Sequence, residues 1–71
     1  MLRCHLRRFR NKKGLKQVEL SNMTDIPQYR LSLIETGKAI TTKDELGRLS
    51  EALNIPTVYI YEDSLVEMIE D

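Results

Sequence analysis

The apolar residues of this chain recur at intervals of three and four positions, the spacing that places side chains on one face of a helix. The first such stripe consists of Leu2, Leu6 and Phe9. It predicts a helix over 2–13 that ends at Gly14, because glycine readily adopts the left-handed conformation that terminates helices. The basic residues of this segment occupy the other faces of the predicted helix.

Two further short helices are predicted over about 16–23 and 27–36. Val18, Leu20 and then Met23 supply the apolar positions of the first, and Leu31 and Ile34 form the stripe of the second. Residues 24–27 between them include a threonine and an aspartate, which favour turns, and a proline, which is tolerated in the first turn of a helix. Two short helices joined by a tight turn form the layout of a DNA-binding helix-turn-helix.

A fourth helix is predicted to begin after Thr42, because residues 42–45 match a capping box. Asn54 is expected to end it in a left-handed conformation. Gly47 inside this helix indicates either a close approach by another backbone or a weak point. The apolar face of the helix comprises Leu46, Leu49, Ala52 and Leu53.

The C-terminal part of the chain is predicted to contain a short fifth helix over 56–61, although residues 58–61 also have the propensity of a strand. Residues 62–71 are acidic with interspersed apolar positions. They are expected to form a short extra helix or a frayed tail, with a role in dimerisation as one interpretation. The expected organisation is therefore one all-α domain over 1–61 followed by this acidic segment.

The distribution of charge adds a functional indication, although the net charge of the chain is zero. Residues 1–38 contain nine Lys and Arg against three Asp and Glu, a net charge of +6. Residues 39–71 contain two against eight, a net charge of −6. This asymmetry favours contact between the N-terminal half and a polyanion, with solvated helix faces as the alternative explanation. A chain of 71 residues supports only a small core, so close helix packing or a partner subunit is expected.

Other classes of function find little support in the residues. His5 is the only histidine and has no second metal ligand at a useful spacing, so no enzyme, metal or cofactor is expected. Cys4 is the only cysteine, which suits an ordinary thiol in a reducing cytoplasm. No apolar run reaches the ~18 residues of a membrane span, and the basic N-terminus lacks the apolar region of a signal peptide. Without a second domain, no small-molecule ligand is expected.

A series of residues over about 5–61 matches a family pattern: Arg10, Lys13-Gly14-Leu15-Lys16-Gln17, Glu19-Leu20-Ser21, Ile26-Pro27-Gln28, Leu31-Ser32-Leu33-Ile34-Glu35-Thr36-Gly37-Lys38, and Leu46, Leu49 and Ala52-Leu53-Asn54-Ile55. In these residues the chain resembles the phage-repressor and Cro type of helix-turn-helix proteins, the Xre-like family. The resemblance implies a compact five-helix repressor-like DNA-binding domain, with the helix-turn-helix in its second and third helices.

Two positions in the turn depart from the family pattern. Asp25 stands where the family usually has glycine, at a position that tends to need a positive φ. Aspartate tolerates that conformation better than most residues. Pro27 stands where serine or threonine commonly caps the third helix, so we expect the cap to come from Thr24 or Asp25.

The third helix is expected to read DNA, with Leu31 and Ile34 facing the core. Gln28 can bond bidentately to adenine. Tyr29 and Leu33 can touch a thymine methyl group, with packing inside the domain or against a partner as the alternative. The candidate base-reading residues are Gln28, Tyr29, Ser32 and Leu33.

Candidate phosphate contacts flank the third helix. The resemblance implies that Gln17 contacts a phosphate at the start of the second helix. The remaining candidates are Lys16, Thr36, Lys38, Thr41 and Lys43. Arg7, Arg8 and Arg30 are weaker candidates for phosphate contacts, and for each of them we favour simple solvation at the surface. The resemblance also implies a structural salt bridge between Arg10 and Glu35.

These interpretations favour a sequence-specific DNA-binding regulator, a repressor that binds a palindromic operator as a homodimer on double-stranded DNA. The alternative is a protein-interaction module of the same fold, such as an antitoxin or a docking subunit. The apolar residues expected either in the dimer contact or in the core of the monomer are Val58, Ile60, Leu65, Met68 and Ile69.

Overall fold

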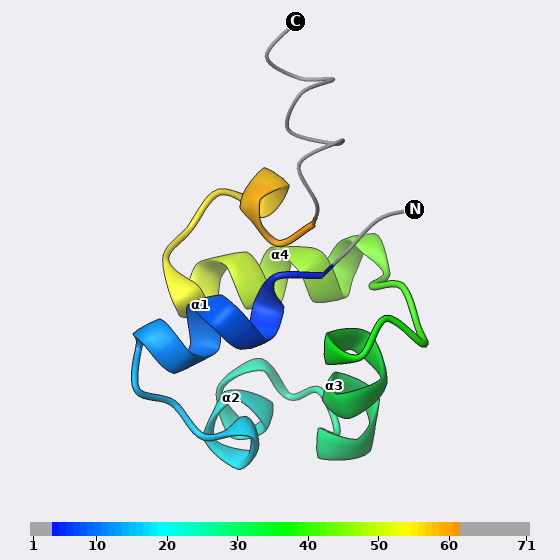
Figure 1. Cartoon of the computed structure of the whole chain (residues 1–71), viewed down its shortest axis with the longest axis horizontal. Coiled ribbons are helices and arrows are strands. Elements are labelled where there is room, and N and C mark those ends of the chain that lie inside the picture. The colour runs from blue at the N-terminus through cyan, green and yellow to red at the C-terminus, as the bar shows by residue number, and fades with distance from the viewer. Residues whose placement is uncertain (1–3, 62–71) are drawn as a thin grey trace, which may run out of the picture.

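The computed structural model describes residues 4–61. All the regular secondary-structure elements in this range are helices. The helices are α1 (Leu6–Lys12), α2 (Gln17–Thr24), α3 (Gln28–Glu35), α4 (Lys43–Leu53) and the single 3-10 turn η1 (Thr57–Tyr59), shown in Figure 1. The fold is all-α as predicted, with four α-helices and a 3-10 turn in place of the fifth helix. The predictions for Leu2 and for residues 62–71 lie outside the described residues.

The helices enclose one small apolar core. In Figure 1, α2 and α3 lie at one end of the molecule, α4 crosses above them, and η1 lies on the far side of α4. Leu31 and Ile34 are fully buried as predicted, whereas Val18 and Met23 are 45% and 55% exposed, so these two predicted apolar positions of α2 do not face the core. The buried apolar residues are Leu6, Leu20, Ile26, Leu31, Ile34, Leu49, Leu53, Ile60 and Tyr61.

The first helix begins at Leu6, four residues later than predicted. Cys4 instead forms an isolated antiparallel bridge with Tyr61, and the amide of His5 donates to the carbonyl oxygen of Ile60 at 2.6 Å. Backbone groups engaged in this pairing are not available to a helix. The two ends of the described chain therefore meet, which Figure 1 shows beside α4. Ile60 is fully buried here, so it belongs to the core of the monomer and not to a dimer contact.

The turn between α2 and α3 has the predicted backbone conformation but not the predicted cap. Asp25 adopts a left-handed conformation with φ of 60°, and its amide donates to the carbonyl oxygen of Ser21 at 2.8 Å. The hydroxyl of Thr24 donates back to the carbonyl oxygen of Leu20 at 2.8 Å, and α3 has no side-chain cap. Pro27 occupies the N-cap position of α3 without a side-chain cap. The orientation of α3 therefore depends on its packing against the neighbouring helices.

The ends of α4 form as their sequence predicts. The amide of Glu45 donates to the hydroxyl of Thr42 at 3.1 Å, and the Glu45 carboxylate accepts from the amide of Thr42 at 2.9 Å. Asn54 ends the helix with a φ of 56°. A methyl group built on Gly47 would meet no atom within 4 Å, so this glycine is a weak point and not a site of close approach.

Candidate DNA interface

The four candidate base-reading residues share the exposed face of α3. Gln28 and Tyr29 stand in its first turn, and Ser32 and Leu33 follow one turn later. All four are exposed, with Tyr29 at 71% and Leu33 at 37%. The buried residues Leu31 and Ile34 hold the opposite face against the core, so packing inside the monomer does not account for Tyr29, while Leu33 is partly covered.

A chain of polar contacts joins this face to α1 and α2. Arg10 donates to the Glu35 carboxylate from Nε at 2.8 Å and from Nη2 at 3.2 Å. Glu35 also accepts from the side-chain amide of Gln17 at 3.3 Å. Gln17 in turn accepts from Nε2 of Gln28 at 3.2 Å. A candidate phosphate contact, a candidate base reader and the Arg10–Glu35 salt bridge thus form one connected network.

The salt bridge in this network is largely withdrawn from water. The side chains of Arg10 and Glu35 are 10% and 4% exposed. The third bond of the guanidinium goes from Nη1 to the carbonyl oxygen of Leu15 at 2.8 Å. Because all these groups are satisfied, the pair holds α1, the segment before α2 and the end of α3 in one arrangement.

The candidate phosphate contacts differ in their exposure and in the hydrogen bonds that they already make within the domain. Lys16, Lys38 and Lys43 are exposed. The hydroxyl of Thr36 donates to the carbonyl oxygen of Ser32 at 2.8 Å, within its own helix. Thr41 is half-buried, and its amide lies 2.7 Å from the hydroxyl of Tyr61, which its own hydroxyl also meets at 2.9 Å.

Arg30 has a structural role that the sequence analysis did not predict. It donates to the Glu45 carboxylate from Nε at 3.0 Å and from Nη2 at 2.9 Å, and Nη2 also reaches the carbonyl oxygen of Ile40 at 3.1 Å. This arginine therefore joins α3 to the capping box of α4, and the expectation of simple solvation is wrong. The hydrogen bonds from Arg30 hold the pKa of the Glu45 carboxyl below its usual value.

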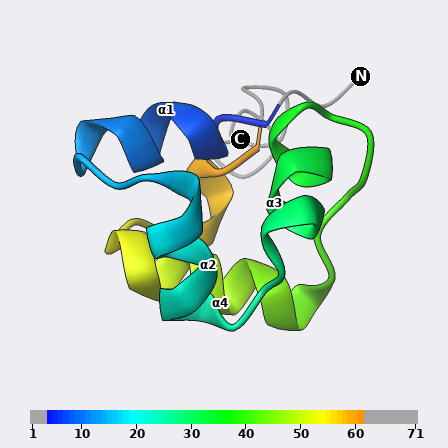
Figure 2. The same cartoon turned by 90° about the horizontal axis from the view of Figure 1, so that it is seen from below.

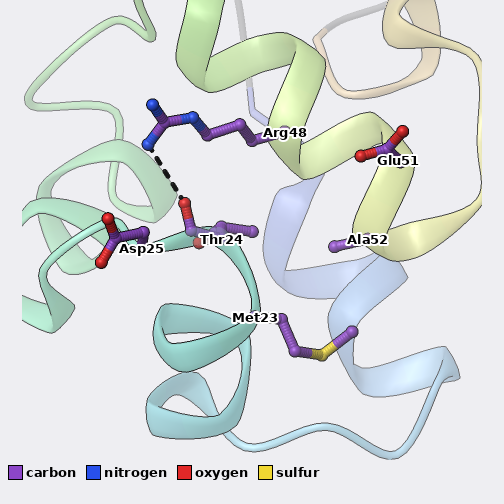
Figure 3. Close-up of a pocket in the computed structure, with 6 residues that line it drawn as sticks. All are labelled: Met23, Thr24, Asp25, Arg48, Glu51 and Ala52. Atoms are coloured by element: carbon purple, nitrogen blue, oxygen red, sulfur yellow. Dashed lines mark hydrogen bonds between the residues drawn. The ribbon is translucent and has the colours of Figure 1, made fainter.

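Two of the surface hollows adjoin opposite ends of α2. The larger, about 330 Å³, lies between α2 and α4 and contains none of the candidate DNA contacts. Arg48 lines it and donates to the carbonyl oxygen of Thr24 at 3.3 Å, as Figure 3 shows. The smaller, about 210 Å³, is lined by Arg7, Arg10, Gln17, Ser32, Glu35 and Thr36. The smaller hollow therefore adjoins the candidate DNA surface.

Three further features of the described residues bear on other kinds of site. Residues 4–61 contain no group of three His, Cys, Asp or Glu side chains that could hold a metal ion. Burial raises the pKa of the Cys4 thiol, which favours the unreactive protonated form. No helix within the same residues is long and apolar enough to cross a membrane.

The fold and the exposed face of α3 define a helix-turn-helix DNA-binding domain, whose α2, turn and α3 are seen together in Figure 2. A family model described as helix-turn-helix matches residues 6–60. The chain belongs to this Xre/Cro-type family of DNA-binding regulators, which is not usually enzymatic. No curated protein sequence matches the chain.

Proposed function

We propose that this protein is a cytoplasmic transcriptional repressor that binds a palindromic operator as a homodimer. The observation that carries the proposal is the exposed face of α3, on which Gln28, Tyr29 and Leu33 stand away from the core. In a helix-turn-helix this face enters the major groove, and the N-terminal residues of the helix approach the base edges. Bound there, the protein would act by blocking polymerase.

Base reading is assigned to the four exposed residues of α3. Gln28 would recognise adenine, since its amide can accept from N6 and donate to N7. Tyr29 and Leu33 would lie against thymine methyl groups, and Ser32 would bond to a neighbouring base edge or phosphate. This combination of one amide and two apolar side chains favours a half-site rich in A·T pairs.

Phosphate contacts are assigned to the two sides of α3. Lys16 and Gln17 lie at the start of α2, and Lys38, Thr41 and Lys43 lie in and after the loop that follows α3. Thr36 stands at the end of α3 itself. Each lysine contact would release condensed counterions and so make binding weaker at higher salt.

A homodimer would place two copies of α3 in successive major grooves, about 34 Å apart. The apolar surface of η1 supports a contact between copies, because Tyr59 is 46% exposed and Val58 is only half-buried. The acidic residues 62–71 would extend this contact with Leu65, Met68 and Ile69. Such a self-complementary contact matches the twofold symmetry of a palindromic operator.

Selection of bound sequences from a random DNA library, followed by mobility shifts at about 50 and 200 mM salt, tests the proposal. We expect two inverted A·T-rich half-sites, two chains per operator and markedly tighter binding at the lower salt. An isolated half-site that binds one chain as tightly as the full operator would contradict the dimer. If no DNA is bound at the lower salt, the regulator is excluded and the protein-interaction module becomes the better interpretation.

A further inference from the structure

The smaller hollow is lined by a cationic side chain that no hydrogen bond or ion pair within residues 4–61 engages. Arg7 lines this hollow from α1, is exposed, and makes no hydrogen bond or ion pair with any residue in the range 4–61. Arg30, also expected at first to be a solvated arginine, is instead engaged by Glu45 and Ile40. Arg7 thus differs from Arg30 in that the described part of the chain uses none of its hydrogen-bond donors.

The second cation of the hollow is already used. Arg10 engages the Glu35 carboxylate through Nε and Nη2 and the carbonyl oxygen of Leu15 through Nη1. Glu35 in turn is neutralised by Arg10, and its side chain is only 4% exposed. The charges that line the hollow are therefore one buried ion pair and the guanidinium of Arg7, which no residue in the range 4–61 pairs, and this leaves the hollow attractive to an anion.

The position of the hollow identifies which anion would approach it. Its remaining lining residues are Gln17, Ser32 and Thr36, all of which belong to the proposed DNA surface. Arg7 stands one helical turn before Arg10 on α1, so both side chains leave the helix on the same side. A DNA backbone that follows the N-terminal end of α2 would pass the mouth of this hollow.

We propose that Arg7 binds a backbone phosphate of the DNA at this hollow and so extends the interface from α2 and α3 to α1. The inference rests on the proposed function. A guanidinium can donate two parallel hydrogen bonds to phosphate oxygens, which fixes orientation as well as supplying charge. Since the contact is to the backbone, Arg7 would add affinity without adding base specificity.

Arg7→Gln tests the assignment, with Arg8→Gln as a matched control. Arg8 is the next residue of α1 and is also exposed, but it does not line the hollow. Both variants replace an arginine with a glutamine and therefore change the net charge equally. We expect Arg7→Gln to reduce the magnitude of the slope of log K against log salt by about 0.9, the value of one phosphate contact. Arg8→Gln should leave the slope unchanged. The base preference selected from a random library should be the same for both variants and the parent protein.

The outcomes separate this inference from the proposed function. If the parent protein binds DNA and the two variants have the same salt slope, the assignment of Arg7 is wrong while the regulator remains. If the parent protein binds no DNA at about 50 mM salt, both fail together. Thermal unfolding of the two variants should match that of the parent, because neither side chain is buried. Arg7→Lys should restore most of the slope, since a lysine retains the charge.

Discussion

Glu35 accepts hydrogen bonds from Arg10 across 25 positions of the sequence, with Oε2 at 2.8 Å from Nε. The contact joins α1 to the C-terminal end of α3. The same carboxylate accepts from Gln17, which accepts from Gln28, so the contact also reaches the face of α3 that we propose to read bases. The ion pair therefore bears on both the stability of the domain and the orientation of α3.

We expect Glu35→Ala to lower the free energy of unfolding by about 3 kcal/mol, because it leaves the charge of Arg10 nearly buried and unpaired. Replacing both partners, as Arg10→Met with Glu35→Leu, should cost less than Glu35→Ala alone, since no unpaired charge remains. Urea unfolding of the three proteins measures the differences.

The exposed pair Asp44–Arg48 is the control for this prediction. Its side chains are 72% and 46% exposed, and its N–O distance of 2.8 Å equals that of the Arg10–Glu35 pair. Asp44→Ala should cost no more than about 1 kcal/mol, because water screens an exposed pair. Equal losses from Asp44→Ala and Glu35→Ala would show that burial does not determine the contribution of these pairs.

We expect Gln28→Ala and Leu33→Ala to weaken specific binding without lowering thermal stability. Both side chains are exposed, so their loss leaves no core cavity. Gln28→Ala should reduce discrimination at one A·T pair by about 1–3 kcal/mol. Competition binding against operators with single changes measures this, with Asn11→Ala on the exposed surface of α1 as an amide control. A large fall in the melting temperature would mean that these residues support the fold and not the readout.

Gly47→Ala should stabilise the domain by about 0.5–1 kcal/mol. Alanine favours the interior of a helix, and the added methyl group would meet no atom within 4 Å. Gly37→Ala is the matched control, because Gly37 has a φ of +79° and space around it as well. There the same methyl group should destabilise by about 1 kcal/mol through backbone strain. Thermal or urea unfolding should therefore shift in opposite directions for the two variants.

The pairing of Glu45 with Arg30 predicts a dependence of stability on pH. Because the pKa of Glu45 is lowered in the folded protein, its carboxylate stabilises the fold above its ordinary pKa of 4.5 and loses this effect as the pH falls through the lowered value. We expect Glu45→Gln to be less stable than the parent at pH 7, with the difference shrinking below about pH 4.5.

Urea unfolding of both proteins over this range measures the effect. Arg30→Gln removes the same pairing, so its stability should approach that of the parent over the same range of pH. A difference between parent and Glu45→Gln that stays constant from pH 7 to acid would contradict the assignment of Arg30 as the cause of the lowered pKa.

The sequence predicted well where local interactions decide the structure. The capping box of Thr42 and Glu45 and the left-handed conformations of Asp25 and Asn54 involve residues within a few positions of each other. The buried stripe of Leu31 and Ile34 likewise follows from helical periodicity. These features depend on interactions between residues three or four positions apart, so they can be predicted from the order of the residues.

Two predictions failed where segments distant in the sequence come into contact. Cys4 and His5 are not part of the first helix as predicted, because the backbone near Cys4 pairs with that near Tyr61 at the other end of the described chain. Arg30 looked solvated because its partner Glu45 lies 15 residues away. No local pattern marks either contact.

The sequence by itself therefore determined the class of the domain and the position of the helix that we propose to read DNA, since periodicity and capping act over three or four residues. The family resemblance had already implied the pairing of Arg10 with Glu35, which the structure contains. Only the tertiary structure decided that Arg30 pairs with Glu45 and that Arg7 is exposed beside Gln17. Similar arginines acquire different roles because an ion pair depends on distances between helices, which the packing of the core sets.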